Sequence, residues 1–136
     1  MNIYLASTYS NHPEMREWKE TLAKAGYTVT SRWITGEDEP FEGTKNPEMN
    51  HTFATHDLED LENSDIAIFD CRPETHGKGQ GGRHVEFGFA LCEEMPVIII
   101  GEPENVFHYL NRVIVVKDLE EAITIIDEDE RIWAGR

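Results

Sequence analysis

Two short runs of the sequence are almost entirely apolar, and they limit the possible folds more than any other feature. The first is Asp-Ile-Ala-Ile-Phe-Asp at residues 65–70, and Pro-Val-Ile-Ile-Ile at 96–100 has the same character. Such runs are typical of strands in parallel sheets, because helices then cover both faces and no side chain meets water. Segments at 2–6, 27–34 and 113–116 predict three further strands. The sequence therefore predicts a five-stranded parallel sheet.

Amphipathic helices are predicted between these strands. Apolar residues recur at spacings of three and four, the pattern of a helix with one buried face, in segments that begin near Pro13, Pro47, Gly82 and Leu119. Parallel strands joined by helices require right-handed crossovers. The predicted fold class is α/β, a flavodoxin-like (Rossmann-like) doubly wound sandwich, formed as a single domain over residues 1–136.

The net charge restricts the possible partners. The chain of 136 residues has 27 acidic and 12 basic residues, which gives a formal net charge of −15. This charge repels nucleic-acid backbones and anionic membranes, so we expect neither as a partner. No apolar run approaches the ~20 residues of a membrane span. Cys71 and Cys92 form neither a metal-binding spacing nor a disulfide framework, and no signal peptide is visible, so we expect a cytoplasmic protein.

A ligand site is expected where the carboxyl ends of the strands meet. In doubly wound sheets, ligands bind beyond these ends, near the point where the strand order reverses. Three features should meet there: the turn after Ala6, the strand end at Asp70, and the helix start that carries Glu86. A loop at residues 35–48 is either a lid over this site or a solvated insert.

Glu86 and Asp57 are the carboxyl groups with the clearest potential for chemistry. Glu86 interrupts an apolar pattern near a helix start, where the helix dipole favours the ionised form, although an ordinary N-terminal glutamate has the same pattern. Asp57 lies four residues from both Phe53 and Leu61, so it points along a buried stripe, where a carboxylate needs a partner or a function. Two carboxylates about 5 Å apart are the equipment of a retaining glycosyl transfer. The neighbouring acidic residues fall off the stripe and are expected in solvent: Glu59, Asp60 and Glu62.

Other motifs give weaker signals. Residues 77–82 match the dinucleotide pattern G-x-G-x-x-G, but they follow the third strand and not the first. A flexible collar whose backbone N–H groups face a ligand is the simpler role. The six histidines have no metal-binding arrangement, so no metal site is predicted. Neither a G-x-S-x-G elbow nor a Cys-His pair indicates another nucleophile.

Three segments carry a resemblance to a known family. Residues 82–91, Gly-Arg-His-Val-Glu-Phe-Gly-Phe-Ala-Leu, look like the G-x-x-x-E-x-G-x-A-L helix of the nucleoside 2-deoxyribosyltransferase family. That family includes a branch of 2′-deoxynucleoside 5′-phosphate N-hydrolases. Residues 3–6 are similar to its first strand, which carries an active-site tyrosine, and residues 56–58 are similar to its aspartate helix. The resemblance extends from the first strand to Gly101.

The resemblance implies a reaction and a set of site residues. Glu86 would be the nucleophile that forms a covalent 2-deoxyribosyl intermediate, Tyr4 would hold its carboxylate by a hydrogen bond, and Asp57 would help to protonate the departing base. No cofactor is implied. A neighbouring subunit of a homo-oligomer would complete the site through residues 105–111. The residues expected to contact the substrate are Ser7, Thr8, Tyr9, Asp70, Gly82, Arg83 and Asn111.

The reaction stays open among three hypotheses. The first is transfer of the sugar of an unphosphorylated deoxynucleoside to another base, because the charge of −15 disfavours a phosphate. The second is hydrolysis of nucleoside 5′-monophosphates, and the third is a catalytically silent nucleotide-binding module. Possible stacking surfaces for a free base are Tyr9, Trp33 and Phe41, and possible phosphate contacts are Ser7, Thr8, Arg83 and His84. Gln80 stands where some family members have an acidic residue, so the choice of base is open as well.

Overall fold

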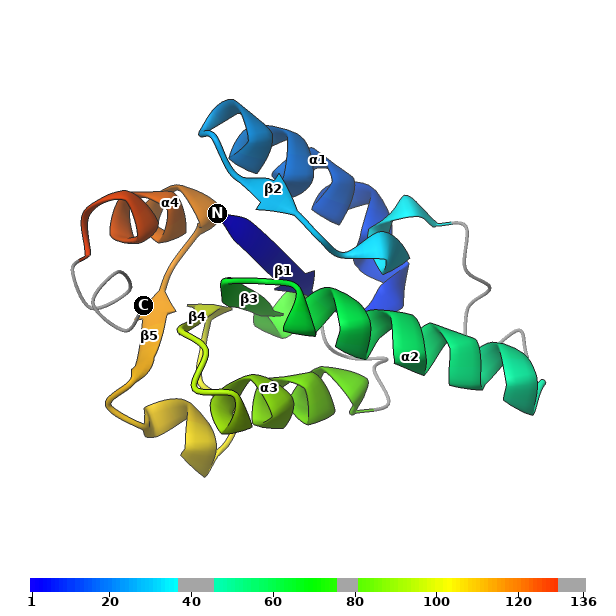
Figure 1. Cartoon of the computed structure of the whole chain (residues 1–136). Coiled ribbons are helices and arrows are strands. Elements are labelled where there is room, and N and C mark those ends of the chain that lie inside the picture. Colours follow the sequence, from blue (N-terminus) through cyan, green and yellow to red (C-terminus); the bar gives the residue numbers. More distant parts are fainter. Residues whose placement is uncertain (37–45, 76–80, 130–136) are drawn as a thin grey trace.

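The protein forms a parallel sheet with helices on both faces. The computed structural model describes residues 1–36, 46–75 and 81–129 (Figure 1). The strands are β1 (Asn2–Ala6), β2 (Thr28–Val29), β3 (Ile66–Cys71), β4 (Val97–Gly101) and β5 (Val113–Val116), and the α-helices are α1 (His12–Lys24), α2 (Pro47–Glu62), α3 (Gly82–Cys92) and α4 (Leu119–Glu128). The strand order is β2-β1-β3-β4-β5, and all neighbours are parallel. This order is that of the flavodoxin-like fold, so the predicted fold class is confirmed.

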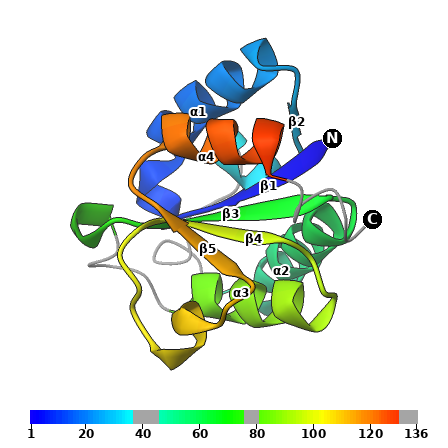
Figure 2. The same cartoon turned by 90° about the vertical axis from the view of Figure 1, so that its left-hand side faces the viewer.

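The helices lie in two layers. Figure 2 shows α1 and α4 on one face of the sheet and α2 and α3 on the other. Phe69 of β3 packs edge-on against Phe87 of α3, with the ring centroids 5.2 Å apart. Because successive side chains of a strand point to opposite faces, the next residue, Asp70, turns toward α1. Near the carboxyl end of β3, the two faces of the sheet therefore present different side chains, an aromatic ring toward α3 and a carboxyl group toward α1.

The centre of the core is formed by β3 and β4. Every residue of β3 is buried, as are Val97–Ile100 of β4. Burial of one large aliphatic side chain contributes roughly 1.5–3 kcal/mol. The two apolar runs therefore form the buried central strands that their composition predicts.

The second strand is much shorter than its alternation predicts. β2 ends at Val29, and the 3-10 helix η2 (Arg32–Thr35) follows. Side chains replace the expected ladder. The Ser31 hydroxyl accepts a hydrogen bond from Leu5 N at 2.8 Å and donates one to Leu5 O at 3.0 Å. The Trp33 indole N–H also donates to Leu5 O, at 2.8 Å. These contacts fasten η2 to β1.

Helix α2 begins where the sequence predicts but buries less of its length. Pro47 occupies its first turn, and the Asn46 side chain caps it by accepting a hydrogen bond from Glu48 N at 2.9 Å. Leu61 is fully buried, whereas Leu58 of the predicted apolar stripe is 36% exposed. In Figure 1 the N-terminal half of α2 extends beyond the sheet. The contact of α2 with the core is therefore concentrated in its C-terminal half.

Parts of two predicted features lie outside the described residues. The described chain ends at Gly36 and resumes at Asn46, so the middle of the predicted lid, with Phe41, is not covered. Most of the glycine-rich collar, with Gln80, precedes Gly81 and is likewise outside. The roles predicted for these segments stay predictions.

Candidate active site

Tyr4 and Glu86 meet on the face of the sheet that α2 and α3 cover. Tyr4 is fully buried in β1, and its hydroxyl donates a hydrogen bond to Glu86 Oε2. Its neighbours Ile3 and Leu5 point to the opposite face, because side chains alternate along a strand. The hydrogen bond that the resemblance implies is therefore present.

The packing of α3 on the sheet fixes the position of Glu86. Phe87 is buried, and its ring lies 5.2 Å from that of Phe69 and 4.6 Å from that of His108. Glu86 precedes Phe87 and lies, half-buried, at the border of this apolar face. The chain enters α3 through Gly81, whose φ of 89° lies in the left-handed region that favours glycine. A glycine at this point thus permits the turn that starts the helix.

Burial and negative charge raise the pKa of Glu86 to about 8. Burial contributes most, and the charge of Asp57 adds to it, while the Tyr4 hydrogen bond and the Arg83 cation offset part of the shift in pKa. Burial also raises the pKa of Tyr4 well above its usual value, with further contributions from both carboxyl groups. Tyr4 therefore remains a hydrogen-bond donor at physiological pH. Glu86 retains its proton over much of the neutral range.

Asp57 approaches the same cluster from α2. It is half-buried, its Oδ1 atom lies out of contact with solvent, and its charge acts on both Tyr4 and Glu86. β1, α2 and α3 thus bring together the residues predicted as catalytic. Carboxyl groups that repel each other titrate as a pair, so this cluster holds a proton near neutral pH. A carboxyl separation of roughly 5 to 7 Å, which the proposed chemistry needs, stays a prediction.

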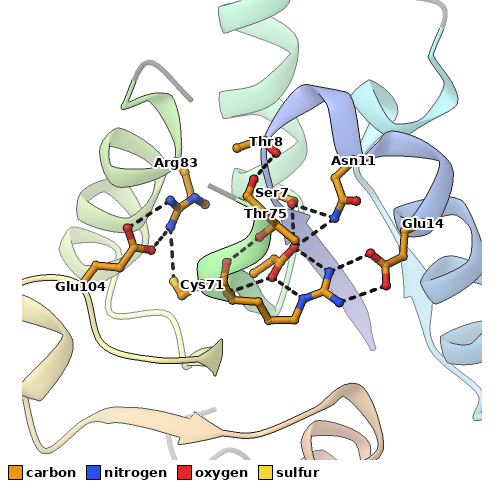
Figure 3. Close-up of polar contacts among 10 residues, drawn as sticks. Ser7, Thr8, Asn11, Glu14, Cys71, Thr75, Arg83 and Glu104 are labelled. Carbon is orange, nitrogen blue, oxygen red and sulfur yellow. Dashed lines mark hydrogen bonds and ion pairs between the residues drawn. The ribbon is translucent and has the colours of Figure 1, made fainter. Parts of the chain in front are cut away.

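Asp70 and Ser7 face α1 and not the carboxyl pair. Asp70 is buried and accepts hydrogen bonds from Ser7 Oγ at 2.8 Å, Asn11 Nδ2 at 3.1 Å and Arg72 Nε at 2.8 Å. Arg72 also pairs with Glu14, at 2.8 Å, and Figure 3 shows this network between α1 and the end of β3. Burial alone would raise the pKa of Asp70, but the hydrogen bonds from Arg72 and Ser7 outweigh it and hold this pKa below its usual value. The network orders the turn after β1.

Thr8 and Tyr9 lie in that turn. Thr8 is buried, and its hydroxyl donates to Thr75 O at 2.6 Å, which ties the turn to the 3-10 helix η4 (Pro73–Thr75). The Tyr9 ring lies 5.1 Å from the His12 ring and 6.4 Å from the Trp33 ring. Both residues therefore make contacts within the fold, and their substrate contacts stay predictions.

Arg83, at the start of α3, has a carboxylate partner. Its guanidinium contacts both oxygens of Glu104, and its Nη1 donates to Cys71 Sγ at 3.3 Å (Figure 3). The Arg83 side chain is only 10% exposed. Gly82, the first residue of α3, is exposed. A phosphate at this point would compete with Glu104 for the guanidinium.

Asn111 does not join the cluster within one chain. It is exposed in the turn after the 3-10 helix η5 (Val106–Tyr109). The next residue, Arg112, donates a hydrogen bond to Leu91 O near the C-terminal end of α3, whereas Glu86 lies nearer the N-terminal end. A binding role for Asn111 would thus serve a second copy of the chain, as predicted from the resemblance.

Asp60 and Arg32 form a contact that the sequence reasoning missed. Asp60 is buried and not solvated as predicted, because it accepts hydrogen bonds from Arg32 N at 2.9 Å and Arg32 Nε at 2.8 Å. Arg32 lies 28 residues earlier in the chain, so the periodicity of α2 gives no signal for this partner. The one available hint is the spacing of three from Asp57, which places both carboxylates on adjoining positions of the helix.

Within residues 1–36, 46–75 and 81–129, no three metal-ligating side chains converge. No helix in that part of the chain is long and apolar enough to cross a membrane.

The fold matches those of two solved enzymes. A 2-deoxyribosyltransferase from the bacterium Bacillus psychrosaccharolyticus superimposes with a TM-score of 0.70 and 20% identity, over 97% of this chain and 96% of that chain. A CMP N-glycosidase from Clostridium botulinum gives a TM-score of 0.54 and 14% identity, over 93% of this chain and 98% of that chain. No family model and no curated protein sequence matches. The chain thus has the α/β fold of these two enzymes.

Proposed function

We propose that the protein is an enzyme that cleaves the N-glycosidic bond of a deoxynucleoside and transfers the sugar to another base. The observation that carries this proposal is the cluster of Tyr4, Asp57 and Glu86, in which a buried tyrosine donates to the Glu86 carboxyl group and the charge of Asp57 acts on both residues. Two carboxyl groups that repel each other in a buried place lower stability, so a nucleotide-binding module has no use for them. The fold shared with two N-glycosidic-bond enzymes supports the same conclusion.

The reaction proceeds in two balanced steps. In the first, a Glu86 oxygen attacks the anomeric carbon, the C–N bond breaks, its electron pair goes to the base nitrogen, and Asp57 gives that nitrogen a proton. In the second, an acceptor base attacks the same carbon, the C–O bond to Glu86 breaks, and the proton of the acceptor passes to Asp57. The pair ends with the one proton it began with.

Tyr4 biases the position of this proton. Its hydroxyl donates to Glu86, and a hydrogen bond to a carboxylate favours the ionised form. Because the pKa of Glu86 is raised to about 8, this proton lies on Glu86 over much of the neutral range and has to pass to Asp57 before Glu86 attacks. The Tyr4 hydrogen bond favours that transfer. Burial keeps the pKa of Tyr4 high, so the direction of this hydrogen bond does not reverse.

Arg83 supports an unphosphorylated substrate. It is the cation that acts on Glu86, and it already has Glu104 as a partner. Breaking that pair would expose a carboxylate to the phosphate in a chain of net charge −15. A neutral nucleoside avoids this repulsion.

Hydrolysis of a nucleoside 5′-monophosphate is the competing candidate. The exposed Gly82 opens α3, and backbone N–H groups at a helix N-terminus bind phosphate well. The CMP N-glycosidase that shares the fold also favours this candidate.

A turnover assay separates the hypotheses. Deoxynucleosides and monophosphates are supplied with and without a second free base, and the products are separated by chromatography. A new nucleoside with ping-pong kinetics supports transfer. Free sugar phosphate from monophosphates supports hydrolysis, and saturable binding without any product supports a binding module. Glu86→Gln is the negative control and should give no product. Glu20→Gln makes the same change on the exposed surface of α1 and should leave activity unchanged.

We also propose a homo-oligomer, located in the cytoplasm. Val106, Phe107 and Tyr109 of η5 are 76%, 60% and 72% exposed, and clustered exposed apolar groups mark interaction surfaces. A contact there between two copies would cover them and bring Asn111 toward a neighbouring site. Light scattering at micromolar concentration tests this: Phe107→Glu should lower the mass, and a monomeric wild type contradicts the proposal.

The state of the cysteines supports the proposed location in the cytoplasm. Both cysteines are unpaired, as in a reducing compartment.

A further inference from the structure

Asp60 fastens α2 to the segment that follows β2. Its side chain is 8% exposed and accepts hydrogen bonds from Arg32 N at 2.9 Å and Arg32 Nε at 2.8 Å. Arg32 Nη2 also donates to His56 O at 3.3 Å and to Glu59 Oε2 at 3.0 Å. Arg32 therefore holds α2 at residues on both sides of Asp57.

The same segment is fastened to β1 next to Tyr4. Ser31, immediately before Arg32, exchanges hydrogen bonds of 2.8 Å and 3.0 Å with the backbone of Leu5. Trp33, immediately after Arg32, donates to Leu5 O at 2.8 Å. Because Leu5 adjoins Tyr4, Arg32 connects α2 to the backbone beside the tyrosine by a short path.

A second connection reaches the other side of Tyr4. Ser64 Oγ donates to Asp60 O at 2.7 Å and lies 2.6 Å from Thr30 Oγ1. Thr30 N donates to Ile3 O at 2.9 Å. The end of α2 is therefore tied to both backbone neighbours of Tyr4.

These polar contacts matter because α2 has little apolar packing. Along α2, the buried residues are Asp60 and Leu61. A single buried leucine does not define how a helix is rotated about its axis. Asp57 lies three residues before Asp60, on an adjoining position of the helix, so a rotation of α2 would move both.

We propose that Asp60 is a positioning residue: by holding Arg32 it fixes the rotation of α2, and thereby the distance between Asp57 and Glu86. The expected effect on rate rests on the proposed function. The distance between the two carboxyl groups is a property of the folded chain and can be tested without turnover.

The pKa of Glu86 reports on this distance. The charged and titratable groups that act on it are Asp57 and Asp60 from α2, Tyr4 from β1 and Arg83 from α3. The negative charge of Asp57 raises the pKa of Glu86, so a retreat of Asp57 lowers that pKa. Titration of the side-chain carboxyl carbons by ¹³C NMR measures it directly.

Asp60→Asn is the first variant. It weakens the contact with Arg32 and removes a negative charge, so the pKa of Glu86 should fall toward its usual value. The value of kcat should fall about 10- to 100-fold, since small displacements of reacting groups have effects of this size, while KM stays within about threefold.

The variant Arg32→Gln distinguishes two effects on the pKa of Glu86, a movement of Asp57 and the loss of a charge. Removal of a cation alone would raise the pKa of Glu86, whereas a retreat of Asp57 lowers it. We expect a lower pKa and a lower kcat. Glu59→Gln is the matched control, because Glu59 pairs with the same arginine but its side chain is 53% exposed. It should change neither quantity.

Two measurements on these variants decide whether Asp60 positions Asp57: the pKa of Glu86 and kcat. A higher pKa of Glu86 in Arg32→Gln, or an unchanged kcat in folded Asp60→Asn, overturns the proposal. If Asp60→Asn does not fold, Arg32→Gln decides alone, because the backbone N–H bond to Asp60 survives in it. If the wild type turns over no nucleoside, the proposed function fails, and the NMR titrations still decide whether Asp60 positions Asp57.

Discussion

Asp70 and Glu86 are acidic side chains on opposite faces of one sheet, and their pKa values shift in opposite directions. The pKa of Asp70 is lowered, because the Arg72 guanidinium contacts it and outweighs the effect of burial. The pKa of Glu86 rises to about 8, because burial is reinforced by a second carboxyl group. Arg83, whose positive charge acts on Glu86, is itself paired with Glu104. Asp70, whose charge is balanced by Arg72, supports the fold. Glu86, whose charge is opposed by burial and by Asp57, is suited to proton and group transfer.

Replacement of Glu86 should have the largest effect. Glu86→Gln keeps the shape of the side chain but removes the nucleophile, so kcat should fall on the order of 10³-fold or more. Thermal unfolding should show equal or higher stability, because the repulsion from Asp57 disappears. Steady-state kinetics measure the rate. Activity within tenfold of the wild type would show that Glu86 is not the nucleophile, and the proposed difference in role between Glu86 and Asp70 would be wrong.

Replacement of Asp70 should act on stability instead. Asp70→Ala leaves Arg72 with Glu14 as its remaining carboxylate, and breaking a buried ion pair costs about 3 kcal/mol. Urea denaturation measures this loss. Glu14→Gln is the control, since its side chain is 38% exposed and surface pairs contribute about 1 kcal/mol or less. If Asp70→Ala keeps its stability and loses turnover, Asp70 is a substrate contact, as the sequence predicts.

Asp57→Asn should reduce the rate less than Glu86→Gln. Loss of a general acid typically costs about 10²-fold, so kcat should fall by that order. The loss should shrink for nucleosides whose bases leave without protonation, because they need no acid. Rates are compared across a series of bases of decreasing basicity. An equal loss for all bases means that Asp57 is not the proton donor.

The pH dependence of stability gives the smallest effect, with opposite signs on the two faces. The lowered pKa of Asp70 contributes stability that is present above the unfolded pKa and lost as the pH falls through the folded pKa. The raised pKa of Glu86 contributes stability that is present below about 4.5 and lost as the pH rises toward about 8. Between pH 6 and 8 the wild type should lose about 1 to 2 kcal/mol relative to Glu86→Gln. Urea denaturation at each pH measures the difference, and parallel curves refute it.

The sequence predicts the fold because its signals are local. The runs at 65–70 and 96–100 are buried from their second residue onward, and helical periodicity locates each helix start within a few residues. The length of β2 is missed for a physical reason. Ser31 and Trp33 bond to the backbone of Leu5 through their side chains, and an alternating pattern does not reveal such contacts. That residues 1–136 form one domain stays a prediction.

The site is predictable only in part. Tyr4 and Glu86 are 82 residues apart, and the resemblance to a known family pairs them where periodicity does not. Asp60 is missed because its burial depends on Arg32, a residue of another element. An ion pair between residues far apart in the chain does not affect the periodicity of the sequence, so Asp60 and Arg32 look like ordinary surface charges.

The two thiols of the chain have a practical consequence. Cys71 is 1% exposed, and burial raises its pKa to about 12, whereas Cys92 is exposed at the last residue of α3. An alkylating reagent should therefore modify Cys92 alone in the folded protein. Glu86 lies six residues earlier on the same helix, about 9 Å away along its axis. A fluorophore or spin label at Cys92 thus gives an optical or magnetic signal of ligand binding, even in variants that have lost all turnover.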